Sequence, residues 1–95
     1  MLEELIKQGE GLMPELKKGM AGHYFDSVNF ETWVAKSVLY LETTHKESIV
    51  TEKIKTNYKS LNGNGTYAFY RLLLGSLKAM ADSGANQAAI TKESE

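Results

Sequence analysis

Apolar residues recur at spacings of three and four in four segments of the chain, and no segment of comparable length alternates with a period of two. Each segment predicts a helix that turns one face toward a core. Because the connections between the segments are short, sequential helices are expected to be antiparallel neighbours. The sequence therefore predicts an all-α protein with the architecture of an up-down four-helix bundle.

The length of the chain allows one such core. A protein of 95 residues buries roughly two thirds of the surface that its unfolded chain exposes, which is enough for a single core and not for two. We therefore expect one helical-bundle domain over residues 1–83. From Asp82 onward the sequence lacks a convincing apolar face, and residues 84–95 are expected to form a disordered tail.

The first segment contains Pro14, which would normally break a helix. The apolar phase is the same before and after this proline, and the proline projects onto the polar side, where water can replace the lost hydrogen bond. This pattern favours one kinked helix over residues 2–20. The alternative is two short helices with Pro14 opening the second, and Gly9 and Gly11 just upstream favour it.

The second segment predicts a helix over residues 30–44 and has the most regular core face of the four. The preceding residues, 21–29, are expected to form a loop that supplies an N-cap from Asp26, Ser27 or Asn29. The predicted core face consists of Phe30, Trp33, Val34, Ser37, Val38, Leu41 and His45. Leu39 is the exception, because it points to the side opposite Leu41.

A third helix is predicted over residues 48–60, with a narrower apolar stripe of Val50, Ile54, Asn57, Tyr58 and Leu61. Asn and Gly dominate residues 61–66 and predict a turn. Thr66 is then expected to cap a fourth helix over residues 67–83. The most buried side chains of the bundle are expected to include Trp33, Val34, Leu41, Leu73 and Leu77.

The fourth segment is unlike the others because it is apolar around most of its circumference. Its polar strip of Tyr67, Arg71, Lys78 and Asp82 covers a sector of about 60° at 100° per residue, which leaves an apolar sector of roughly 260°. Such a helix is either the central helix of the bundle or part of a subunit interface. A monomer that exposed so much apolar surface would be unusual, so a homodimer is expected.

Two edges of the fourth helix are candidates for that interface, and the helical angles alone do not choose between them. One edge carries Ala68, Leu72, Gly75 and Ala79, and the other carries Tyr70, Leu74 and Ala81. Gly75 and Ala79 would let another backbone approach closely. With the outward Leu39 added, the expected partner-binding residues are Leu39, Tyr70, Leu72, Leu74, Gly75 and Ala79.

Composition excludes several classes of protein. The absence of cysteine excludes disulfide scaffolds, zinc fingers and thiol catalysis. Eleven basic and twelve acidic residues leave no basic footprint for nucleic acid. No apolar run approaches the roughly 20 residues of a membrane span, and the amphipathic N-terminus has no signal-peptide core. We therefore expect a cytoplasmic protein that binds neither nucleic acid nor membrane.

Two constellations could carry chemistry. Glu42 and His45 have the i,i+3 spacing by which di-iron bundles hold metal, but a full site needs a second such motif and two further glutamates. His23 and Asp26 could orient a base, but no nucleophile or oxyanion donor completes a site. In the same loop, Tyr24 and Phe25 are expected to plug one end of the bundle. The sequence thus predicts no enzyme, no cofactor and no metal site.

Several stretches of the chain together are similar to a small helical domain at the N-termini of bacterial phage-defence proteins, including TIR-like nucleotide-binding effectors and abortive-infection proteins. The stretches are Leu5-Ile6, Gly9-Glu10 and Leu12, then Phe30-Glu31-Thr32-Trp33, Leu39-Tyr40-Leu41-Glu42 and Gly75-Ser76-Leu77-Lys78-Ala79. The resemblance covers residues 2–81 and implies an accessory or interaction module without catalytic residues. The family's module precedes an effector domain, whereas this chain stops after the module.

Three functions are therefore compared. The first is a non-catalytic α-helical protein–protein interaction or oligomerisation module in a bacterial or phage-immunity setting, with a protein partner that includes its own copy. The alternative is a free-standing phage or mobile-element inhibitor that binds a bacterial defence protein. The third, a helical enzyme that binds a metal or another ligand, rests only on Glu42, His45 and His23.

Overall fold

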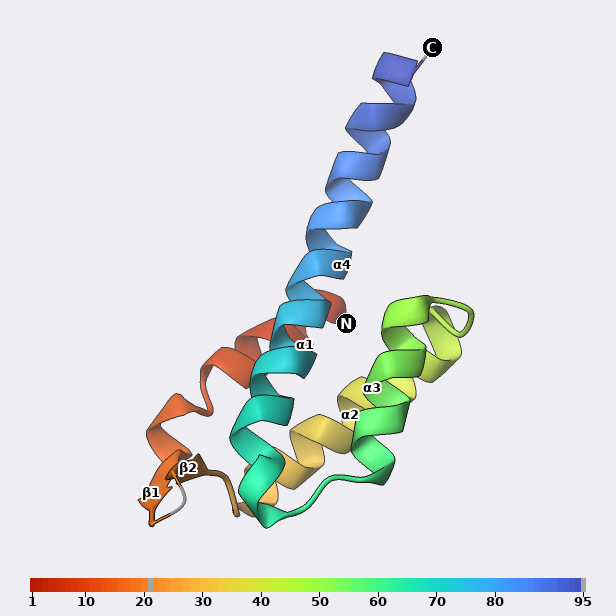
Figure 1. Cartoon of the computed structure of the whole chain (residues 1–95). Helices are drawn as coiled ribbons and strands as arrows, with labels where there is room; N and C mark the ends of the chain where they lie inside the picture. Colours follow the sequence, from red (N-terminus) through yellow and green to blue (C-terminus); the bar gives the residue numbers. More distant parts are fainter. Residues whose placement is uncertain (21, 95) are drawn as a thin grey trace.

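The computed structural model describes residues 1–20 and 22–94, with side chains described as far as Asp82. In this part of the chain the fold is mostly helical, with a small two-stranded antiparallel sheet (Figure 1). The α-helices are α1 (Leu2–Glu10), α2 (Val28–Thr44), α3 (Ile49–Lys59) and α4 (Thr66–Ser94). The strands are β1 (Lys17–Gly19) and β2 (Gly22–Tyr24), and the 3₁₀ turns are η1 (Met13–Glu15) and η2 (Gly63–Gly65).

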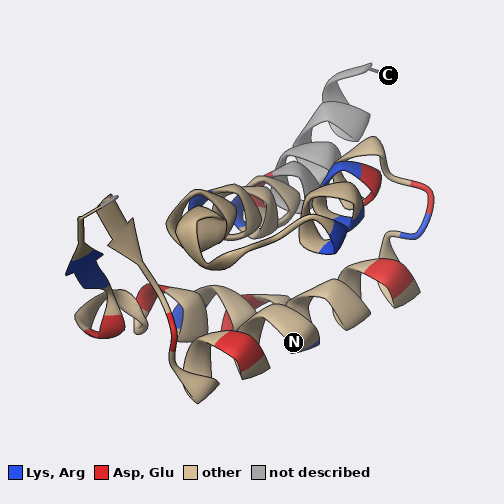
Figure 2. Ribbon diagram, turned by 60° about the horizontal axis from the view of Figure 1, so that its bottom comes forward, with Lys and Arg blue, Asp and Glu red and all other residues tan. Residues whose placement is uncertain are grey.

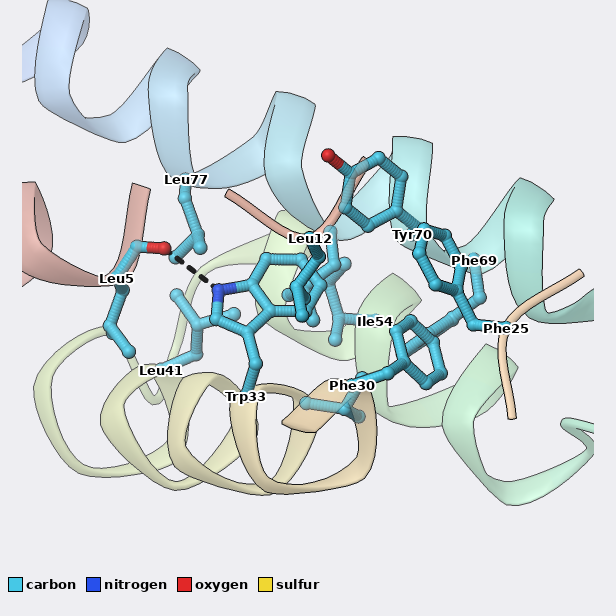
Figure 3. Close-up of a cluster of buried hydrophobic side chains, with 12 residues drawn as sticks. Leu5, Leu12, Phe25, Phe30, Trp33, Leu41, Ile54, Phe69, Tyr70 and Leu77 are labelled. Atoms are coloured by element: carbon cyan, nitrogen blue, oxygen red, sulfur yellow. Dashed lines mark hydrogen bonds between the residues drawn. The ribbon is translucent and has the colours of Figure 1, made fainter. Parts of the chain in front are cut away.

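The helices lie in two layers, with α1 and α2 on one side and α3 and α4 on the other (Figure 2). Helix α4 packs against α1, α2 and α3 and also contacts β2. It is therefore the central helix, which explains why so much of its circumference is apolar. The core cluster consists of Leu5, Leu12, Phe25, Phe30, Trp33, Val34, Leu41, Ile54, Phe69, Tyr70, Leu73 and Leu77 (Figure 3).

The expected kinked helix over residues 2–20 is wrong. Helix α1 ends at Glu10, and Pro14 lies in the short turn η1 rather than inside a helix. Proline has no N–H to donate and its ring clashes with the carbonyl four residues earlier, so the chain leaves the helix before it. The apolar spacing continues past Pro14 although the helix does not. Leu12, just before η1, is buried, and Leu16, just after η1, packs against the core from extended backbone.

The expected loop over residues 21–29 is also wrong in part, because residues 22–24 form β2. This strand pairs antiparallel with β1, with Lys17 opposite Tyr24 and Gly19 opposite Gly22. Gly22 has a φ of 117°, a conformation that side-chain-bearing residues rarely adopt. Strands of three residues are too short to display a period of two, so the periodicity did not predict them.

The hairpin is fastened to α4 by the residue that follows it. Phe25 is buried as expected, and its ring stacks on Phe30 at a centroid distance of 4.7 Å and contacts Tyr70 at 4.8 Å. Its backbone N–H donates to Oγ1 of Thr66 at 2.8 Å, and the Thr66 hydroxyl donates to the carbonyl of Gly63. Thr66 therefore ties β2 to the start of α4 instead of capping the helix as expected.

The predicted helices over residues 30–44 and 48–60 are confirmed as α2 and α3. The hydroxyl of Ser27 caps α2 by accepting the N–H of Phe30, and Ser48 caps α3 by accepting the N–H of Val50. All five side chains expected to be most buried, namely Trp33, Val34, Leu41, Leu73 and Leu77, are at most 2% exposed.

The expected buried stripe of α3 is partly wrong. Ile54 is fully buried as predicted, but Tyr58 is 41% exposed and Asn57 is exposed. Thr51, which the pattern did not select, is buried instead. The small volume and the methyl group of Thr51 allow it to be buried although the side chain is polar.

Helix α1 approaches the core unusually closely at Gly9. The indole Nε1–H of Trp33 donates to the carbonyl of Leu5 at 2.7 Å (Figure 3). The hydroxyl of Tyr70 donates to the carbonyl of Gly9 at 2.7 Å. A Cβ placed on Gly9 would lie 2.6 Å from Cζ2 of Trp33 and 3.0 Å from Cδ1 of Leu74. Only glycine therefore fits between α1 and the indole ring.

The backbone of α4 continues as a helix to Ser94. The side chains of residues 83–95 lie outside the described part of the structure. The expectation that residues 84–95 form a disordered tail consequently stays a prediction.

Gly9 in α1 and Gly75 in α4 are predicted to respond oppositely to the same substitution. Gly9→Ala should lower the free energy of unfolding by about 1–3 kcal/mol, because the new methyl group overpacks against Trp33. Gly75→Ala should raise it by about 0.5–1 kcal/mol, because a Cβ there meets nothing within 4 Å and alanine favours the helix. Urea denaturation measures both. A Gly9→Ala protein as stable as the original would contradict the close approach.

A second pair of variants tests the core. Leu77→Ala should cost about 2–5 kcal/mol of unfolding free energy, because Leu77 is fully buried and its loss leaves a cavity. The matched change Leu39→Ala, at a side chain that is 65% exposed, should shift stability by less than about 0.5 kcal/mol at low protein concentration. Equal costs for the two variants would show that the core is assigned to the wrong faces.

Candidate interaction surface

The structure separates the two edges of α4 that were candidates for partner binding. On one edge, Tyr70 is buried and Leu74 is half-buried beside Gly9. Burial raises the pKa of the Tyr70 phenol, so the hydroxyl stays protonated as the donor to the Gly9 carbonyl. This edge faces α1 of the same chain.

The other edge of α4 faces outward. Ala68, Gly75 and Ala79 are exposed, whereas Leu72 is half-buried where α4 meets α3. The exposed part of this edge therefore carries only small side chains. The large exposed hydrophobic residues in the described part of the chain all lie elsewhere, at Met1, on α2 and α3, and in the segments between helices.

Leu39, the remaining candidate, lies in a hollow of about 400 Å³ between α1 and α2. Its side chain is 65% exposed, and that of Met1 on the opposite wall is 71% exposed. Leu5, which lies at the bottom, is buried. Met1, Glu4, Leu5 and Gln8 line the hollow from α1 and its start, and Lys36, Leu39, Tyr40, Thr43 and Thr44 line it from α2.

The spacing of these residues explains how the hollow forms. The lining residues of each helix recur at intervals of three and four, so each set occupies one stripe of its helix. Leu5 of the α1 stripe accepts a hydrogen bond from Trp33 of α2, and this contact packs α1 against α2 beside the hollow. Sequence reasoning identified Leu39 as outward-facing but missed Met1 and Glu4, because their position depends on where α1 docks.

A few charged residues elsewhere on the surface form ion pairs. Lys78 pairs with Glu10 at 2.8 Å, Lys55 with Glu42 at 3.0 Å and Lys17 with Asp26 at 2.7 Å. The hydrogen bond from Lys55 to Glu42 raises the pKa of Lys55, since the carboxylate favours the charged amine. Glu4 and Lys36 on the hollow make no ion pair with any described residue.

The candidate chemical groups are engaged in ordinary contacts. Glu42 pairs with Lys55, and the ring of His45 packs edge-on against Tyr40 at 5.7 Å. The ring of His23 lies 5.7 Å from that of Tyr67. Among the side chains that the structure describes, in residues 1–20 and 22–82, no group of three or more His, Asp or Glu is arranged to hold a metal ion.

Comparisons with protein-family models, with curated proteins and with solved structures gave no match. Within the described residues, every helix is too short or too polar to cross a membrane.

We predict that Glu42 and His45 bind no metal ion. Thermal melting with and without Fe(II), Zn(II) or Mn(II) should give the same midpoint, because Glu42 is held by Lys55. An ion that bound tightly to the native state would raise the midpoint by several degrees through mass action. A shift that disappears in the His45→Ala variant would contradict this prediction.

Proposed function

We propose that this protein is a non-catalytic α-helical protein–protein interaction module that associates with its own copy. The observation that carries the proposal is the hollow between α1 and α2, where Leu39 and Met1 line opposite walls and are both largely exposed. Exposed apolar side chains gathered in a concave surface are typical of sites that bind another protein. Helices α1 and α2 supply most of the residues that line the hollow, and Met1 lies at the start of α1.

We further propose that the helices form an up-down four-helix bundle and that the protein works as a cytoplasmic homodimer. The resemblance of residues 2–81 to the helical domain of phage-defence proteins supports a role in bacterial or phage immunity. An inhibitor of a host defence protein would use the same kind of surface with a heterologous partner.

The proposal predicts a homodimer in solution. Static light scattering on a size-exclusion column should give a mass near 10.6 kDa for dilute protein and about twice that mass as the concentration rises, because association follows mass action. A mass that stays at the monomer value at all concentrations would rule out self-association. The surface would then be assigned to a heterologous protein partner.

A further inference from the structure

The two walls of the α1–α2 hollow carry opposite charges. Glu4 lies on the α1 wall and Lys36 on the α2 wall, and both are exposed. Neither forms an ion pair with a described residue, so both are free to meet a charge on a partner. The hollow therefore combines an apolar centre with one charge of each sign, and neither charge has an ion-pair partner among the described residues.

The order of residues along the hollow follows from the antiparallel course of α1 and α2. Gln8 and Lys36 also line the neighbouring hollow, which is bounded by Gly11 and Leu12 after α1 and by Asn29 early in α2. Lys36 therefore lies at the Gln8 end. Glu4 is four residues farther from that end, about 6 Å along the helix, which is within the reach of a lysine side chain.

A twofold axis that runs along the hollow would place the α1 wall of each copy against the α2 wall of the other. Such an arrangement brings the apolar centres together and sets the negative wall of each copy against the positive wall of the other. The single symmetry operation therefore creates two contacts between opposite charges. A heterologous partner would instead need an apolar ridge that fits the hollow, with a positive charge facing Glu4 and a negative charge facing Lys36.

We propose that this hollow binds a second copy of the same chain, with Leu39 at the centre of the contact and Glu4 of each copy paired with the partner's Lys36. The inference rests on the proposed self-association and names its surface and its charge pairing. Desolvated charge pairs of this kind set the register of an interface and exclude partners with like charges.

Charge reversal tests the pairing. Glu4→Lys and Lys36→Glu should each weaken the homodimer about ten- to a hundredfold, because each homodimer then contains two like-charge contacts. An equimolar mixture of the two variants should form a heterodimer with both contacts restored. The double variant Glu4→Lys, Lys36→Glu should dimerise like the original chain. Light scattering and native mass spectrometry of differently tagged chains measure these states.

Mixing the two variants shows whether Glu4 and Lys36 pair between two copies or within one chain. If Glu4 and Lys36 paired only within one chain, each variant would still lack its own pair after mixing, and no heterodimer would be favoured. Leu39→Glu should give a folded monomer. The matched control Gly75→Glu places the same charge on the outward edge of α4 and should leave the dimer intact. Circular dichroism verifies that each variant folds.

The outcomes distinguish this inference from the broader proposal. If the protein dimerises but Leu39→Glu remains dimeric, or if Gly75→Glu gives the monomer, the hollow is not the interface and self-association stands. If Leu39→Glu gives the monomer but the charge reversals have no effect, the crossed charge pairing is overturned. A protein that is monomeric throughout overturns both the inference and self-association.

Discussion

The close approach of α1 to the indole of Trp33 is the contact on which the rest of the structure depends. Gly9 lets the helix backbone approach the ring, and the carbonyls of Leu5 and Gly9 accept hydrogen bonds from Trp33 and Tyr70. Helix α1 is only nine residues long, too short to be stable in isolation. Its helical conformation and its position therefore depend on the hydrogen bonds that Trp33 of α2 and Tyr70 of α4 donate to its backbone.

The candidate surface is a consequence of that contact. Docking at Gly9 places Met1 and Glu4 opposite Lys36 and Leu39, and thereby makes a hollow from two otherwise ordinary helix faces. Residues 4 and 36 are far apart in the sequence, and no local pattern relates them. A change that moved α1 by one turn would remove the hollow without altering any residue that lines it.

Much of the helical fold was predictable because it depends on local pattern. Apolar spacing located α2 and α3 and selected Trp33, Leu41 and Leu77 as buried. The same reasoning failed between residues 11 and 24, where apolar residues keep the helical spacing but Pro14 diverts the chain into a turn and a hairpin. Apolar spacing shows which residues face the core, but it does not show whether the backbone between them is helical.

The sequence by itself determined that three long segments are helical, that Leu39 points away from the core face, and that the fourth segment needs neighbours on most sides. The tertiary structure decided which neighbours these are: α1 covers the Tyr70 edge of α4, while the edge with Gly75 and Ala79 remains outward. Helical angles place residues around one axis, but the side that is buried depends on contacts between segments distant in sequence, because burial is a property of packed elements.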